Sequence, residues 1–321
     1  MALQFPLIYS AQVFTYPHFC LTAFLPLTAG MIAACASAPT TAPTLDELGS
    51  MTYYGVYERP VTLTNGLYEG TPFVAGGASR PRVQLIRPLH AVGDLDGDAN
   101  PEVAVLLAES GGGSGVRTYV AIVARREKRP MNVATRLIGD RVQIRRLAVE
   151  EGAVVLEIIA AGPQEPMCCP TAKRRLVLRL ARRAWHTSVW DELVQVLAQE
   201  LGPLTLTDLE GVTWRLVQFG RDAPVAETVS VTAAFEGDTL SGSAGCNRYF
   251  GSVSGGPHEL KLGPMAATRS ACEPSRMASE TRYLAALQRT TKFGFHLGHL
   301  ALTYRSAEGI DTLLFEAAPA K

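Results

Sequence analysis

The chain has 321 residues, of which 47% are hydrophobic and 19% are charged. This length and this apolar fraction suit one large or two ordinary globular domains, and they exclude an intrinsically disordered protein. Thirty basic residues balance thirty acidic ones, so no net charge directs the chain towards nucleic acid or another highly charged partner.

An uncharged apolar stretch, FCLTAFLPLTAGMIAAC, covers residues 19–35. It is too short to cross a membrane comfortably, but it has the length of the apolar region of a secretory signal. Its last four residues, IAAC, resemble the bacterial lipobox, in which the signal is removed immediately before a lipid-modified cysteine. This resemblance implies a signal peptide over residues 1–34 and lipidation of Cys35. A buried apolar segment and a cleaved signal without lipid are the alternatives.

A short linker follows the predicted anchor. The sequence ASAPTTAPT is of low complexity, as is typical of a flexible tether, which we place over residues 35–48. Ala36 is uncharged and resembles the residue that directs lipoproteins to the outer membrane. We therefore expect the chain in the bacterial cell envelope, bound through its lipid to the outer membrane and facing the periplasm.

Seven segments rich in β-branched residues predict strands between residues 49 and 185, separated by glycine, proline and asparagine turns. They are VTLTNG, PRVQLIR, EVAVLLA, TYVAIVA, DRVQIRRLAVE, AVVLEIIA and RRLVLRL. Apolar residues then recur at a spacing of three to four in WDELVQVLAQELGP, which predicts a helix over residues 190–201. We expect a β-rich domain over residues 49–202, closed by this helix.

An acidic stretch in this region, VGDLDGDANPEVAV, carries side-chain oxygens at every second position. A tight turn gathers such hard ligands about one cation, as calcium prefers. The pattern resembles the D-x-D-x-D loops of integrin-type calcium repeats. The sequence therefore predicts a structural Ca²⁺ site, and an acidic turn that caps its own amides is the alternative. The predicted ligands are Asp94, Asp96, Asp98, Asn100 and Glu102.

The order of further motifs in this region resembles an uncharacterised module of bacterial envelope proteins, a resemblance that implies no activity. These motifs are LDELGSMTYYG, VTLTNGLYEG, GDLDGD, ESGGGSG, IGDRVQI and PMCCP. ESGGGSG lacks the lysine of a phosphate-binding loop and precedes a predicted strand, so we expect a hairpin turn there.

Four cysteines lie outside the predicted signal and anchor, and an oxidising envelope compartment lets them pair. They are Cys168, Cys169, Cys246 and Cys272. Of three possible pairings, the order along the chain favours Cys246 with Cys272, which leaves the adjacent pair as a vicinal bridge or two free thiols. The glycine-rich stretch GSAGCNRYFG predicts a bulged strand corner that holds Cys246. A structural disulfide is the prediction, and free buried thiols and a redox pair are the alternatives.

The C-terminal motifs follow one another in the order of a known family. LEGVTWRLV, LSGSAGCNRYFGS, LGPMAATRSAC, SETRYLAAL, HLALTY and TLLFE resemble the META domain of heat-inducible envelope lipoproteins. Met277, Leu284 and Leu287 share one face of a helix predicted near Ser275–Gln288. The resemblance implies a compact domain of antiparallel strands over residues 203–318, with one packed helix and no known catalytic role.

Together these features predict an α+β protein with two β-rich domains. We expect a non-enzymatic envelope lipoprotein, without catalytic residues, that has a binding or stress-tolerance role in the periplasm. Its expected partners are the membrane and an unidentified envelope protein or small ligand, not nucleic acid. A calcium-dependent envelope hydrolase is the alternative.

Overall fold

The computed structural model describes residues 41–162, 165, 170–185, 188–220, 223–225, 229–307 and 309–318, and only the backbone of residues 185 and 188–190. Their secondary structure is mainly antiparallel β-structure, which confirms a β-rich chain with few helices. Its helices are α1 (Leu45–Leu48), α2 (Pro274–Gln288) and the 3-10 helix η1 (Leu206–Leu209). Among the described residues, no helix is both long and apolar enough to span a bilayer. The α+β assignment and the domain boundary near residue 202 stay predictions.

A five-stranded sheet has the order β3-β4-β5-β6-β7. Its strands are β3 (Leu67–Glu69), β4 (Arg82–Gly93), β5 (Glu102–Ser110), β6 (Arg117–Arg126) and β7 (Arg129–Asp140). Most side chains of β5 and β6 are buried, because both faces of the sheet are covered. This explains why EVAVLLA and TYVAIVA are apolar at successive positions rather than alternate ones. ESGGGSG connects β5 to β6 as the predicted hairpin turn.

A four-stranded sheet has the order β11-β10-β9-β8 and covers one of these faces. Its strands are β8 (Gln143–Glu150), β9 (Ala153–Ala160), β10 (Ala172–Trp185) and β11 (Ser188–Pro203). Leu106 and Ile122 of the first sheet share one core with Leu156 and Leu178 of the second. Residues 48–63 cover the opposite face, and they include the short strands β1 (Thr52–Tyr53) and β2 (Val61–Thr62).

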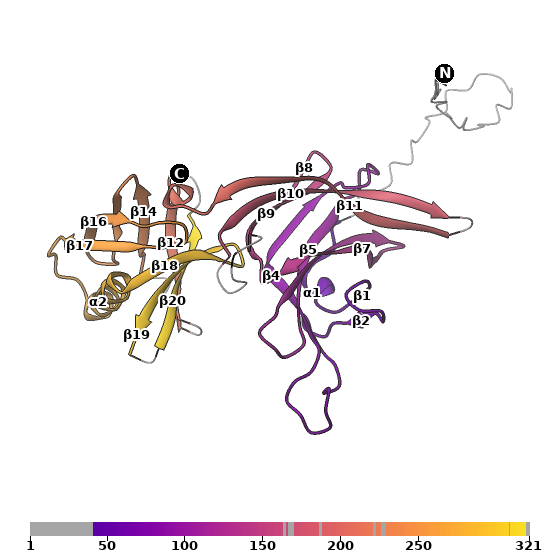
Figure 1. Cartoon of the computed structure of the whole chain (residues 1–321), viewed down its shortest axis with the longest axis horizontal. Coiled ribbons are helices and arrows are strands. Elements are labelled where there is room, and N and C mark those ends of the chain that lie inside the picture. Colours follow the sequence, from indigo (N-terminus) through magenta and orange to yellow (C-terminus); the bar gives the residue numbers. More distant parts are fainter. Residues whose placement is uncertain are drawn as a thin grey trace, which may run out of the picture. The chain divides into compact units, whose positions relative to one another are not determined.

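The helix predicted over residues 190–201 is wrong, because these residues belong to strand β11. Figure 1 shows β10 and β11 as a long hairpin, and their register pairs Leu180 with Leu193. Cross-strand ion pairs support it, with Nε···Oε distances of 2.7 Å for Arg174–Glu200 and 3.1 Å for Arg183–Glu192. Pairing with a strongly β-forming neighbour outweighs the local three-to-four spacing of apolar residues.

The C-terminal region forms a nine-stranded sheet with the order β17-β16-β15-β14-β12-β20-β19-β18, and β13 pairs with β12. Figure 1 shows α2 against this sheet, which confirms the packed helix expected near Ser275–Gln288. Tyr283 of α2 is fully buried, with its ring 5.5 Å from that of Tyr249 and 6.3 Å from that of Phe315. The strands are β12 (Thr213–Phe219), β13 (Ala223–Pro224), β14 (Thr232–Glu236), β15 (Thr239–Ser243), β16 (Arg248–Ser254), β17 (Lys261–Ala267), β18 (Thr290–His296), β19 (His299–Ser306) and β20 (Gly309–Ala317).

Candidate functional site

Two of the predicted sites lie within the residues that the structure describes. The first, which we name the disulfide corner, comprises residues 244–247 and 268–273. The second, which we name the acidic turn, comprises residues 94–102. The predicted lipidation site Cys35 and the vicinal pair Cys168 and Cys169 lie outside the described residues.

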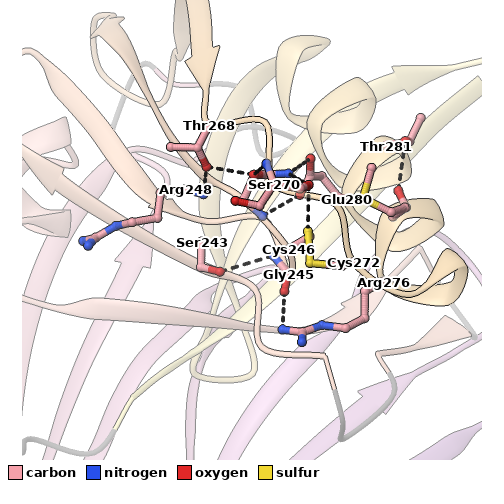
Figure 2. Close-up of a disulfide and its surroundings, with 12 residues drawn as sticks. Ser243, Gly245, Cys246, Arg248, Thr268, Ser270, Cys272, Arg276, Glu280 and Thr281 are labelled. Carbon is pink, nitrogen blue, oxygen red and sulfur yellow. Dashed lines mark hydrogen bonds between the residues drawn. A yellow bond between two sulfur atoms is a disulfide. The ribbon is translucent and has the colours of Figure 1, made fainter.

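The disulfide corner joins Cys246 to Cys272 with an S–S distance of 2.01 Å and a Cα–Cα distance of 5.9 Å (Figure 2). Cys246 lies in a tight turn between β15 and β16, closed by a 2.7 Å bond from the Ala244 amide to the Asn247 carbonyl. Gly245 has a φ of +107°, which an L side chain rarely adopts. The predicted bulge is therefore a turn between two strands, and its glycine sets the direction of Cys246.

A buried polar network fixes the residue that follows Cys246. The Asn247 backbone amide donates to Glu280 Oε2 at 2.7 Å, and its Nδ2 donates to Glu280 Oε1 at 3.0 Å. Asn247 Oδ1 accepts from the Ser270 amide at 2.7 Å and from the Thr268 hydroxyl at 2.8 Å. Asn247 is 3% exposed and Glu280 is 8% exposed. The network ties the turn both to α2 and to the segment that carries Cys272, so the corner is built to hold a conformation.

The acidic turn connects β4 to β5, and its carboxylates accept hydrogen bonds from the amides of the same turn. The N···O distances are 2.7 to 3.1 Å. The donors are Gly97 and Ala99 to Asp94, Asp98 to Asp96, Asn100 to Asp98, and Leu95 to Glu102. This is the arrangement expected for a turn that caps its own amides.

Arg126 supplies positive charge to the acidic turn. Its Nη2 lies 2.8 Å from Asp96 Oδ2, and its Nη1 lies 3.3 Å from Asp98 Oδ2. The hydrogen bond from the Asn100 amide lowers the pKa of Asp98 most. Side-chain hydrogen bonds with Asn100 and Asp96 and the charge of Arg126 lower it further. Burial raises the pKa of Glu102, and the charges of Asp96 and Asp98 raise it further. A guanidinium thus balances part of the charge that a metal ion would otherwise balance.

The donor set of the acidic turn suits a hard cation in part. Asp94, Asp96 and Glu102 each offer a carboxylate oxygen, and these atoms lie within 4.8 Å of one another. Such oxygens are the ligands that Ca²⁺ prefers. Asp98 does not join this group. Three of the four predicted carboxylate ligands therefore come together, and calcium binding stays a prediction.

Two residues of these sites escaped the sequence analysis. Glu280 precedes Tyr283, Leu284 and Leu287 at helical spacings of three, four and seven, a pattern that places it on the buried face of α2. That spacing is a signal that was available in the sequence. Arg126 carried no local signal, because only the antiparallel pairing of β5 with β6 brings the end of β6 beside the start of β5.

The C-terminal sheet, α2 and the disulfide corner together form an antiparallel β-rich region with a packed helix. The family model of the META domain matches residues 207–319, so this region is a META domain and the resemblance is confirmed. No curated protein sequence matches the chain.

Two solved structures are similar to parts of the chain. An NMR structure of a protein from Burkholderia xenovorans is 22% identical, covers 43% of this chain and all of its own, and has a TM-score of 0.30. A second NMR structure is 20% identical, covers 36% of this chain and 95% of its own, and has a TM-score of 0.30. At these TM-scores, neither supports an inference about fold or function.

Proposed function

We propose that this protein is a non-enzymatic lipoprotein of the bacterial envelope, attached through Cys35 to the outer membrane, whose folded part binds a ligand or partner in the periplasm. The pairing of Cys246 with Cys272 carries the proposal, because disulfides persist in oxidising compartments and are rare in the cytosol. The META domain at residues 207–319 supports an envelope-associated role.

The use of the reactive side chains favours binding or a structural role over catalysis. The two cysteines of the META domain are joined, and a joined cysteine offers no thiolate nucleophile. The carboxylates of the acidic turn accept bonds from backbone amides and from Arg126, which stabilises the turn. These groups therefore have a sufficient explanation in the folding of the two regions.

Mass spectrometry of the mature N-terminus, together with membrane fractionation, tests the attachment. We expect a diacylated Cys35 at the N-terminus and the protein in the outer-membrane fraction. Cys35→Ser should abolish the lipid and release or mislocalise the protein. Cys20→Ser, a change within the predicted signal, is the matched control and should leave both properties unchanged. An unmodified Cys35, or cleavage at another bond, would contradict the proposal.

A further inference from the structure

A cleft of about 520 Å³ lies between the segment that follows β1, the β3–β4 connection and the start of β6. Three aromatic side chains, Tyr57, Tyr68 and Phe73, line it together with two prolines. Phe73 is 63% exposed, an unusual state for a phenylalanine. This volume is typical of a cleft that takes a small molecule or one unit of a polymer.

The glycine turn ESGGGSG leaves room for one wall of this cleft. The Phe73 ring lies 3.8 Å from the position that a Cβ on Gly111 would occupy. A Cβ on Gly112 would lie 3.0 Å from Ser79, and Gly112 has a φ of +85°. Gly112 therefore lets the connection over residues 70–81 pack closely over the turn, whereas a Cβ at Gly111 would make only an ordinary van der Waals contact with Phe73.

The floor of the cleft carries an ion pair. Glu109 is 3% exposed, and its two carboxylate oxygens accept from the Tyr57 hydroxyl at 2.9 Å and from Arg117 Nε at 2.5 Å. Glu109 holds the Arg117 guanidinium in place through Nε, while half of the Arg117 side chain remains exposed. A guanidinium fixed in this way retains terminal amino groups that can bind a carboxylate in a forked geometry.

A second hollow, of about 320 Å³, shares Glu109, Gly111 and Arg117 with the first. Its lining combines Gly111, Gly113 and Gly115 with the charged residues Glu109, Arg117 and Asp140, and Asp140 is paired with Arg141. Arg117 and Glu109 line both hollows. An occupant of the two therefore meets aromatic rings in the first hollow, glycines and Asp140 in the second, and the Arg117 guanidinium in both.

We infer that this cleft binds an acidic saccharide, a sugar ring that carries a carboxylate. The C–H face of a sugar ring packs on aromatic side chains, and the tyrosines and Phe73 provide such surfaces. The buried carboxylate of Glu109 already has its partners, and the exposed charges of Arg59 and Glu58 on the same lining offset each other. The fixed donor left for a ligand is the exposed part of the Arg117 guanidinium, whose N–H groups bind a carboxylate more strongly than a neutral hydroxyl. The inference specifies a ligand class for the binding role proposed above. It rests on that proposed function for the location of binding, the periplasm.

Calorimetric titration of the purified full chain in detergent, with three sugars, tests this inference. N-acetylmuramic acid and N-acetylglucosamine share a ring and differ in one carboxylate-bearing group, and glucuronic acid is an acidic sugar of a different source. We expect an acidic sugar to bind about tenfold more tightly than N-acetylglucosamine, as a charge-assisted bond to arginine implies. Tighter binding of N-acetylmuramic acid indicates a cell-wall source, and tighter binding of glucuronic acid indicates an acidic polysaccharide.

Variants assign the binding to the cleft. Phe73→Ala should weaken binding of the acidic sugar about tenfold, because it removes a stacking surface. Phe250→Ala is the matched control, since Phe250 is equally exposed at 61% but lies in the META domain, and it should change nothing. Arg117→Lys keeps the charge that Glu109 needs but loses the fork, so it should reduce the preference for acidic over neutral sugar.

Three results would overturn the inference: no binding of either acidic sugar, equal binding of N-acetylglucosamine, or unchanged binding by Phe73→Ala. Binding of a proline-rich peptide in place of the sugars would also overturn it, because aromatic clefts take such peptides as well. These titrations measure sugar binding and do not require the lipid at Cys35. A negative titration would therefore overturn the sugar inference without contradicting the proposed lipid attachment.

Discussion

The disulfide corner and the acidic turn are stabilised in different ways. Each is a tight connection between antiparallel strands, and each gathers several polar groups. The corner is closed by a covalent bond and a buried network around Asn247 and Glu280. The acidic turn is more exposed and is closed by its own amides and by Arg126. We therefore expect the corner to be insensitive to ions and the turn to respond to them.

Removal of the disulfide should have the largest effect. The bond closes a separation of 26 residues, and Cys246→Ala combined with Cys272→Ala should lower the free energy of unfolding of the META region by about 3 kcal/mol. Each single variant should lose about as much as the pair, because either change breaks the same bond. Denaturant unfolding with and without reductant measures this. If reduction destabilises the double variant as much as the natural protein, the bond is not the cause.

Loss of the buried network around Asn247 and Glu280 should have the second largest effect on the free energy of unfolding. Glu280→Ala leaves the Asn247 backbone amide without its acceptor and leaves Nδ2 only the Ser270 carbonyl, so we expect a loss of about 2 kcal/mol in the free energy of unfolding. Glu280→Gln keeps one oxygen acceptor and should lose less. Combined with loss of the disulfide, Glu280→Ala should cost less than the sum of the two, since both hold one corner. Strict additivity would show that the network and the bond act independently.

Calcium should stabilise the acidic turn and have no effect on the disulfide corner. If the acidic turn binds Ca²⁺, millimolar calcium should raise the free energy of unfolding by about 1 kcal/mol, as for a weak extracellular site. Asp96→Asn should remove most of this gain, because it withdraws one charge from the three clustered carboxylates. Thermal unfolding of the full chain with calcium and with chelator is the measurement. Identical curves would leave only an acidic turn and would also remove the calcium-dependent hydrolase alternative.

Arg126→Gln provides the matched test of that explanation. Arg126 contacts Asp96 and Asp98, so it supplies charge that a cation would replace. Without calcium, this variant should be less stable than the natural protein, because the carboxylates repel one another. With calcium, its gain should be larger than that of the natural protein. An unchanged or smaller gain would show that arginine and calcium do not share the site.

The same contrast between local and long-range contacts explains what the sequence could predict. Strand periodicity predicted β4 to β6 and β8 to β10, and the spacing of apolar residues predicted α2, because these signals lie within each segment. The helix over residues 190–201 was wrong because the partner strand, β10, lies outside the segment and determines its conformation. Local spacing of Leu193, Val194 and Leu197 does not reveal that partner.

The candidate sites divide along the same line. The stretch GSAGCNRYFG and the alternating carboxylates are local patterns, so the sequence identified both the corner and the turn. The cleft of Tyr57, Phe73 and Arg117 combines residues from three separate segments, and it became visible only when the sheet was formed. The stretch ESGGGSG was explained as a hairpin turn, which is correct, but the proximity of Gly111 to Phe73 required the tertiary structure.

The smallest expected effect concerns the N-terminal cap of α1, where Glu47 forms an ion pair with Arg125. Glu47 accepts from Arg125 Nη2 at 2.8 Å and from Nη1 at 3.0 Å, and Arg125 with the Thr44 amide lowers the pKa of Glu47 from 4.5 to about 2. Because the pKa is depressed in the folded state, the stabilisation is present above pH 4.5 and is lost as the pH falls towards 2. Glu47→Gln should lower the free energy of unfolding at neutral pH by about 0.5 kcal/mol, since solvent partly screens a pair in which the Glu47 side chain is 35% exposed. Between neutral pH and about pH 3, the variant should lose less stability than the natural protein.

Glu127→Gln, at an exposed position in the β6–β7 turn, is the control and should keep the natural pH dependence. Denaturant unfolding at several pH values is the measurement, and an unchanged pH dependence in Glu47→Gln would show that this ion pair does not stabilise the fold.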